Sequence, residues 1–197
     1  MEAYADAVNR DLWDQEAEAF DSEPDHGLTE PSARAAWRDL LLSVLPTAPA
    51  RVADLGCGTG TLTRVLTDEG YRVDGVDSSP EMIKRARAKV PESRFVIADA
   101  ATPPLPEDEF DVVLCRHVLW AMSEPADALR QWVALLKPGG IVVLIEGHWA
   151  TGAGLTAAQT AQIVLQVRNE VHVRHLPEPI YWGKEITDER YLAISHR

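Results

Sequence analysis

The chain has 197 residues, and its 19 basic against 31 acidic residues give a formal net charge of −12 at pH 7. This balance argues against a broad nucleic-acid-binding face, which needs clustered Lys and Arg, and against binding to an anionic membrane surface. A domain of this size buries about 70% of its unfolded surface without needing a disulfide or a metal. The two cysteines, Cys57 and Cys115, lack the pattern of a disulfide framework. Such sparse use of cysteine is typical of a protein from a reducing compartment.

The acidic charge is concentrated at the amino terminus. Residues 1–30 contain ten acidic residues and one basic residue, Arg10, whereas the rest of the chain is nearly balanced. We interpret this segment as a solvated helix face; the alternative is a segment that repels anionic ligands or guides a cationic one. It lacks the basic start and apolar core of a signal peptide, and no apolar run approaches a membrane span. We therefore expect a soluble, cytoplasmic protein.

Two helices are predicted before residue 45. Trp13, Ala17 and Phe20 recur at helical spacing, which predicts a first amphipathic helix. A second helix is expected over Pro31–Leu45, because Pro31 suits a first turn and the following residues form a wide apolar face. We expect residues 1–45 to form two helices that lie on a core domain of residues 46–197.

From residue 51 onward, short apolar strands alternate with helices. The expected strands are Arg51–Leu55, Arg72–Val76, Arg94–Ala98, Phe110–Cys115, Ile141–Glu146, Val171–Leu176 and Tyr191–Ser195. The expected helices are Thr61–Glu69, Pro80–Val90, Pro125–Leu136 and Thr156–Arg168. This alternation predicts an α/β fold with a doubly wound, mostly parallel sheet and helices on both faces, and the last two strands close it in antiparallel fashion. The continuous apolar runs of the central strands are typical of strands covered on both sides.

A glycine-rich loop, Gly56–Gly60, joins the first strand of this unit to its helix. Glycines there let the backbone approach a ligand closely, although a tight turn without a ligand remains an alternative. A dinucleotide fingerprint needs Gly or Ala where this chain has Thr61, and the Gly-Lys-Ser/Thr of a P-loop is missing. Asp54, two residues before the loop, would repel a pyrophosphate. The loop therefore suits a ligand that carries an ammonium group.

Acidic residues follow three successive strands of the predicted sheet. Asp77 ends the second strand and can accept hydrogen bonds from both hydroxyls of a ribose; its alternative role is to cap the next helix, for which Ser78 and Ser79 are nearer. Asp99 follows the third strand and can accept from the amine of an adenine, or is simply a loop residue. Because ligands bind at the carboxyl edge of such sheets, the three acids together predict one binding site.

Four ordered segments resemble a known family. They are VADLGCGTGTLT, GVDSSPEMIKRAR, ADAATPPLPEDEFDVVLCRHVLW and LLKPGG. Together they resemble the class I S-adenosyl-L-methionine (SAM) dependent methyltransferases, and within them the small-molecule group related to ubiquinone and menaquinone methyltransferases. The resemblance covers about residues 10–197, and it implies that residues 1–45 form a helical lid that covers the cofactor and helps to define the substrate pocket, over a SAM-binding core of residues 46–197. It implies a Rossmann-like sheet of seven strands with a reversed last strand, SAM as cofactor and S-adenosyl-L-homocysteine as product.

The same resemblance implies which residues bind the cofactor. It places Asp54 near the methionine ammonium, Asp77 on the ribose, and Asp99 beside the adenine. Arg116 falls at a position that faces the methionine moiety, where most members have a small polar residue; it pairs with Asp54 or reaches an anionic substrate. The full set is Asp54, Gly56, Cys57, Gly58, Gly60, Asp77, Ser78, Met82, Asp99, Ala100 and Arg116.

Candidate residues for the acceptor side follow the fourth and fifth strands. His117 and His148 are candidate general bases because their ordinary pKa is near neutral, although each can equally be a structural histidine. The links 116–124 and 147–155 are expected to form walls of the substrate pocket. The predicted pocket residues are Trp13, Phe20, His26, Trp120, Glu146 and Trp149. No metal site is predicted, since His172 and His175 point to opposite faces of a strand.

These features predict SAM-dependent methyl transfer to a small-molecule O, N, S or C nucleophile by in-line displacement. Alignment and desolvation then carry most of the catalysis, and a general base is optional. The expected partner is a small molecule, with no nucleic acid or membrane, and the protein is a monomer or a homodimer. One alternative is a catalytically silent SAM-binding partner protein with the same fold. Another is a nicotinamide-dependent oxidoreductase, against which Asp54 and Thr61 argue.

Overall fold

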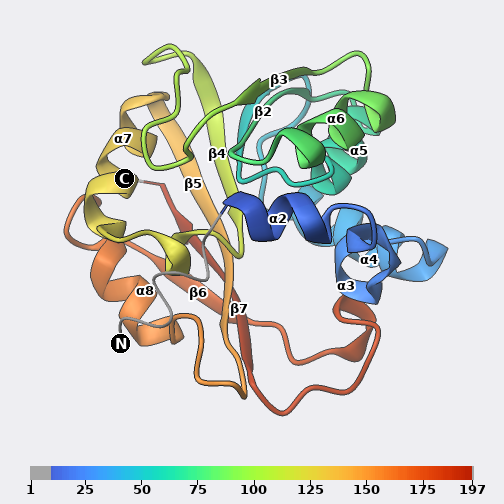
Figure 1. The fold of residues 1–197 in the computed structure, drawn as a ribbon. Helices are drawn as coiled ribbons and strands as arrows, with labels where there is room; N and C mark the ends of the chain where they lie inside the picture. Colours follow the sequence, from blue (N-terminus) through green and yellow to red (C-terminus); the bar gives the residue numbers. More distant parts are fainter. Residues whose placement is uncertain (1–9, 197) are drawn as a thin grey trace.

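The computed structural model describes residues 10–196 and contains a seven-stranded sheet with the order β3-β2-β1-β4-β5-β7-β6 (Figure 1). Among the described strands only β7 runs against its neighbours, pairing in antiparallel fashion with both β5 and β6. This confirms the expected mostly parallel sheet with a reversed last strand. The strands are β1 (Arg51–Leu55), β2 (Arg72–Asp77), β3 (Arg94–Ile97), β4 (Phe110–Arg116), β5 (Leu136–His148), β6 (His172–His175) and β7 (Glu189–Ser195).

Helices cover both faces of this sheet. Helices α4 (Pro31–Leu42) and α5 (Thr61–Asp68) pack on one face, while α7 (Pro125–Ala134) and α8 (Ala157–Val164) pack on the other. Figure 1 shows α7 and α8 on one side of the strands and α5 with α6 (Pro80–Lys89) on the other. None of the described helices has the length and apolar character of a membrane span.

Alternate residues of the central strands pack into two separate hydrophobic cores. In β4, Val112 and Leu114 pack with α4 and α5, whereas Val113 and Cys115 pack with α7 and α8. All four side chains are fully buried. Because both faces of the strand are covered, every position must be apolar, which explains the uninterrupted run read in the sequence.

The amino-terminal segment differs most from its prediction. A single helix through Trp13, Ala17 and Phe20 is wrong: helix α2 (Arg10–Glu16) ends early, and the short turns η2 (Phe20–Ser22) and α3 (Pro24–Gly27) follow. Pro24 lacks the N–H that a continuing helix would use, so a new short helix, α3, begins at this residue. Residues 1–9, the first part of the predicted lid, lie outside the described residues.

The remaining differences concern the ends of elements. Strand β5 begins at Leu136, before the predicted Ile141, because Leu136 pairs with Phe110 ahead of a bulge. The same strand also continues past Glu146 to His148, where it pairs with β7. Three short 3₁₀ turns complete the described elements: η2, η3 (Leu119–Ala121) and η4 (Pro179–Tyr181).

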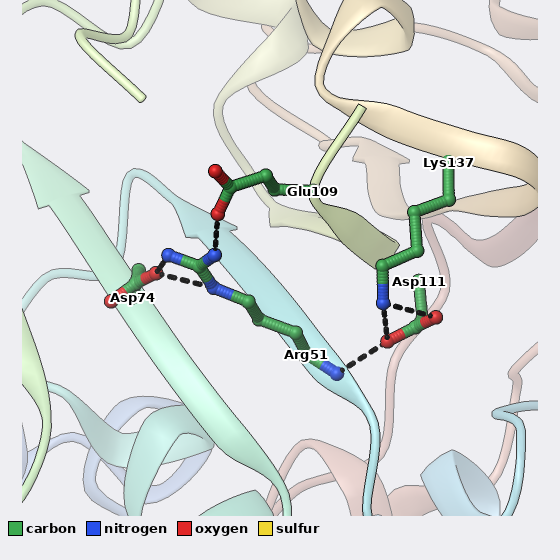
Figure 2. Close-up of polar contacts among 5 residues, drawn as sticks. All are labelled: Arg51, Asp74, Glu109, Asp111 and Lys137. Atoms are coloured by element: carbon green, nitrogen blue, oxygen red, sulfur yellow. Dashed lines mark hydrogen bonds and ion pairs between the residues drawn. The ribbon is translucent and has the colours of Figure 1, made fainter. Parts of the chain in front are cut away.

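An ion-pair network joins the amino-terminal ends of the strands, opposite the glycine loop. The Arg51 guanidinium donates to Asp74 Oδ2 at 2.7 and 3.0 Å and pairs with Glu109 (Figure 2). The Arg51 backbone N–H donates to Asp111 Oδ2 at 2.7 Å, and Lys137 Nζ reaches both Asp111 oxygens at 2.9 Å. Desolvation raises the pKa of Asp111, but the Arg51 N–H and the Lys137 ammonium outweigh it and lower that pKa. The network ties β1 to β2, β4 and β5.

Replacing the arginine of this network tests its contribution to stability. Arg51→Met leaves the nearly buried Asp74 carboxylate without its partner, so the free energy of unfolding in urea is expected to fall by about 1–3 kcal/mol. The control is Arg38→Met, which removes an exposed pair with the adjacent Asp39 and should leave the urea midpoint unchanged. Equal effects of the two substitutions would contradict a structural role for the network.

Candidate active site

A cavity of about 630 Å³ lies at the carboxyl edge of the sheet. The glycine loop, the ends of β1 to β4, the start of α7 and the lid segment all contribute to its wall. Most residues singled out from the sequence meet there: Trp13, Phe20, His26, Asp54, Gly56, Cys57, Gly58, Asp77, Ser78, Met82, Asp99, Ala100, Arg116 and His117. The link 116–124 forms part of the wall, whereas no residue of 147–155 does.

The glycine loop approaches the turn after β4 more closely than any side chain would permit. Gly56 has a φ of +71°, and a Cβ placed on it would lie 2.2 Å from Val118 Cγ2. Gly58 has a φ of +54° and faces Phe20 of the lid. Both positions therefore require glycine, one for space and both for backbone conformation.

Asp77 connects the glycine loop to β2 and also faces the cavity. One carboxylate oxygen accepts the Gly58 N–H at 2.8 Å, and the other accepts the Ser79 N–H at 2.9 Å. Burial raises the pKa of Asp77, and these backbone hydrogen bonds oppose that rise. Each carboxylate oxygen has two lone pairs, so acceptor capacity remains for a ligand in the cavity.

Asp54 is a buried carboxylate without a cation beside it. It is 2% exposed, accepts a hydrogen bond from Thr63 Oγ1 at 2.6 Å, and makes no ion pair among the described residues. Burial raises its pKa to about 6, with a smaller contribution from the negative charge of Asp77. At pH 7 the group is mostly ionised, and a positively charged ligand would relieve the cost of burying it.

The wall of the cavity beside β3 includes two buried apolar residues. These are Met82 and Ala100, and Asp99, just before Ala100, lies at the surface and accepts the Ala101 N–H at 2.8 Å. Trp132 Nε1 donates to the Ala100 carbonyl at 2.6 Å and holds this segment in place. The arrangement suits a planar ring with a polar edge.

The turn after β4 is held by Glu146 from behind the cavity. One Glu146 oxygen accepts the Val118 N–H at 3.0 Å and the Leu119 N–H at 2.8 Å, while His117 adopts a left-handed φ of +58°. Burial raises the pKa of Glu146 to about 8, so the acid is mostly neutral at pH 7. Glu146 was predicted in the substrate pocket; the structure instead places it outside the wall, because its carboxyl group faces these backbone donors.

Four further predicted residues also lie outside the wall. Trp120 donates to the His117 carbonyl at 2.9 Å, and Trp149 packs edge-on against the His117 ring at 5.1 Å, so both support that turn from outside the cavity. His148 remains within β5, opposite Glu189 of β7, because that strand is longer than predicted. Gly60 caps α5 rather than facing the cavity.

Two aspartates of the lid bind the glycine-loop side of the site. Asp14 accepts from Ser79 Oγ at 2.5 Å and from the Glu81 N–H at 3.2 Å. Asp21 accepts from Thr59 Oγ1 at 2.5 Å and pairs with Lys89 Nζ at 2.7 Å. The sequence did not distinguish these two acids from the other acidic residues around them, because nothing in their spacing marks their partners.

Aromatic residues of the amino-terminal segment line the cavity. The Phe20 and His26 rings are stacked with centroids 4.2 Å apart, and both line the wall together with Trp13. Several wall residues were not predicted individually, and they come mainly from the glycine-loop helix and α7: Thr59, Thr61, Leu62, Asp127, Ala128 and Gln131.

Comparisons with known proteins agree with this geometry. The sequence matches the family described as "Methyltransferase domain" over residues 53–144. It is 38% identical over 102 residues to an uncharacterized methyltransferase of Mycobacterium tuberculosis, covering 52% of this chain and 42% of that one. It is 33% identical over 168 residues to a ubiquinone biosynthesis O-methyltransferase of Stutzerimonas stutzeri, covering 82% and 68% of the two chains.

A solved structure shows the same fold. It is a S-adenosylmethionine dependent methyltransferase from Mesorhizobium loti, with a TM-score of 0.67 and 22% identity, covering 81% of this chain and 96% of that one. The chain therefore belongs to the SAM-dependent methyltransferases of class I, a family of enzymes, as its motifs indicated. It spans about two fifths of the length of the mycobacterial relative.

Two substitutions at Glu146 separate its charge from its hydrogen bonds. Glu146→Gln keeps an oxygen for the two N–H groups and needs no proton, so we expect it to be at least as stable as the wild type at pH 7. Glu146→Ala leaves both N–H groups buried without acceptors and should cost about 2–4 kcal/mol in urea unfolding.

The pH dependence of stability tests the same assignment of Glu146 as a buried, mostly neutral acid. The folded-state pKa of Glu146, about 8, lies above its unfolded value, so the stabilising contribution of this group is present below pH 4.5 and is lost as the pH rises toward 8. The stability of the wild type relative to Glu146→Gln should therefore fall between pH 5 and pH 8. A Gln variant as unstable as the Ala variant at pH 7 would contradict the assignment.

Proposed function

We propose that this protein transfers the methyl group of SAM to a small-molecule acceptor bound in the same cavity. The observation that carries the proposal is the set of charged groups on the wall of that cavity: the acids Asp54, Asp77 and Asp99 lie at or after the ends of β1, β2 and β3, and Arg116 and His117 lie at the end of β4. When bound, SAM supplies a methyl group on a sulfonium; the acceptor lone pair forms the new bond while the S–CH₃ electron pair stays on sulfur.

The acidic residues of the wall fit the cofactor. We propose that Asp77 accepts from the ribose hydroxyls, that Asp54 pairs with the methionine ammonium, and that Met82 and Ala100 contact the adenine beside Asp99. Asp54 feels the charge of Arg116 but makes no ion pair among the described residues, and the ammonium of the ligand would supply one. Gly56, Cys57, Gly58 and Ser78 would then lie along the cofactor, as the motif implies.

Of the two candidate histidines, His117 is better placed than His148 to act as a general base. It lines the cavity, whereas His148 does not. Burial, together with the positive charges of Arg116 and Arg190, lowers the pKa of His117 well below its ordinary value, so the ring is neutral at pH 7 and has a free lone pair. The Stutzerimonas relative is named as an O-methyltransferase, which makes hydroxyl compounds the first acceptors to test.

The lid segment explains how the reaction would be kept from water. We propose that residues 1–45 form a lid over the core 46–197, since Trp13, Phe20 and His26 line the cavity and Asp21 binds Thr59 and Lys89. Closing over both ligands aligns the acceptor with the methyl group and removes solvent, which are the main requirements of this displacement. The enclosed volume favours a small acceptor.

Cofactor binding can be tested by calorimetry with SAM. Asp77→Ala removes a charged acceptor that we assign to the ribose and should weaken binding by about 2–3 kcal/mol. Glu107→Ala, on an exposed loop, is the matched control and should bind like the wild type. Unchanged affinity in a folded Asp77→Ala protein would refute the ribose assignment.

Turnover tests the proposed base. His117→Asn is the suitable variant because Asn tolerates the left-handed backbone at this position. With a hydroxyl acceptor found by labelled-methyl transfer, we expect a loss of about 10²–10⁴-fold in turnover with SAM affinity unchanged. His148→Asn, outside the cavity, should retain wild-type turnover.

The alternative function gives a different outcome. Tight SAM binding without transfer to any acceptor in a panel of alcohols, amines, thiols and carbon acids would favour a catalytically silent SAM-binding partner protein. Full activity in His117→Asn would instead show that proximity and alignment suffice, as expected for thiol or amine acceptors.

A further inference from the structure

Buried nitrogen atoms without hydrogen-bond partners gather at the lid end of the cavity. Within the described part of the chain, they include His26 Nδ1, Arg116 Nε, His117 Nε2 and Arg190 Nε. His26, Arg116 and His117 line the cavity wall. A buried polar group left without a partner costs about 1–3 kcal/mol, and more when it is charged. Such a cluster indicates that a ligand provides the missing hydrogen-bond partners.

Arg116 is the central member of this cluster. Its guanidinium donates to the backbone carbonyl of Asp25 in the lid and lies over the Trp37 ring at 4.6 Å. It makes no ion pair with any carboxylate in the described residues, unlike Arg51, Arg64 and Arg190. Desolvation lowers the pKa of Arg116 to about 10, so the group remains charged at pH 7. The carboxylates of Asp25 and Asp54 act on this charge electrostatically, but neither forms an ion pair with it.

A second buried arginine stands behind the first. The Arg190 guanidinium lies 5.0 Å from the Trp149 ring and 5.4 Å from the Trp182 ring, and pairs with Asp188 at 3.0 Å. The His117 ring stacks near Trp182 at 5.9 Å. Both arginines lower the pKa of His117, so the positive charge of each one reaches this part of the cavity wall. This end of the cavity therefore combines two buried arginines with the carboxylates of Asp25 and Asp188, of which only Asp188 forms an ion pair with a described arginine.

We propose that this end of the cavity binds an anionic group of the methyl acceptor, a carboxylate in its simplest form, with Arg116 as its main partner and His26 beside it. The inference rests on the proposed function and adds the substrate class. A guanidinium matches a carboxylate in geometry as well as charge, because its N–H groups form a fork. His117 then stands next to the bound anion, where it can accept a proton from a hydroxyl of the same molecule.

The cofactor also carries a carboxylate, so the source of the anion must be decided. SAM has two positive charges and one negative charge, so it adds one net positive charge to the cavity, and Arg116 has no ion-pair partner among the described residues. An anionic acceptor would supply that partner. The donor His26 also comes from the lid, whereas the proposed cofactor groups Asp77 and Asp99 lie at the ends of β2 and β3. These observations favour the acceptor as the source.

The test compares carboxylates with their neutral amides on protein saturated with S-adenosyl-L-homocysteine. The probes are 4-hydroxybenzoate against 4-hydroxybenzamide and malate against malamide, measured by calorimetry. We expect at least one carboxylate to bind about tenfold or more tightly than its amide, and Arg116→Met to reduce that ratio to about twofold or less. Arg116→Lys keeps the charge and should retain part of the preference, and Arg130→Met, on the surface of α7, is the matched control.

A second arm identifies the source of the anion. Affinities of Arg116→Met for S-adenosyl-L-homocysteine and for 5′-methylthioadenosine, which lacks the amino-acid part, are compared with wild type. Unchanged affinities for both ligands support the acceptor as the source of the anion. A selective loss for S-adenosyl-L-homocysteine would assign the anion to the cofactor and overturn the proposal, as would the absence of any carboxylate preference in the wild type. Failure of the wild type to bind S-adenosyl-L-homocysteine would instead refute the proposed function.

Discussion

The close approach of two loops at the carboxyl edge of the sheet determines the shape of the site. The glycine loop after β1 touches the turn after β4 at Gly56 and Val118, where any side chain at residue 56 would overlap the valine. Each loop is held by a carboxyl group: Asp77 accepts from Gly58, and Glu146 accepts from Val118 and Leu119. The cavity exists because these buried acceptors fix both loops in place.

The two carboxyl groups lie in different surroundings. Asp77 receives hydrogen bonds on both oxygens and faces the cavity, whereas Glu146 is fully buried and is mostly neutral at pH 7. A neutral acid still accepts hydrogen bonds through its carbonyl oxygen, so Glu146 organises the turn without adding a negative charge behind Arg116. The acidic residues and Arg116 can therefore line the same cavity.

Buried charged groups without ion-pair partners destabilise the protein when no ligand is bound. Asp54 and Arg116 are both buried and act on each other electrostatically, but neither forms an ion pair among the described residues. Residues that destabilise the isolated fold in this way are typical of binding sites, where the ligand supplies the missing partner. The acidic amino-terminal segment is more than a solvated helix face, because Asp14 and Asp21 bind Ser79, Thr59 and Lys89 around the glycine loop.

The amino-acid sequence by itself determined the order of strands and helices, the glycine loop and the acids at the strand ends. These features depend on periodicity and on neighbours a few residues away, which a sequence shows directly. Only the tertiary structure decided which side chains of the later strands face the cavity. Glu146 and His148 follow the same strand, yet the extension of β5 and its pairing with β7 turn both away from it. The contact of Arg116 with Asp25 joins residues 91 positions apart, and the donors around it come from the lid, β4 and β7. No local pattern encodes such a meeting, because packing of the whole chain brings these segments together.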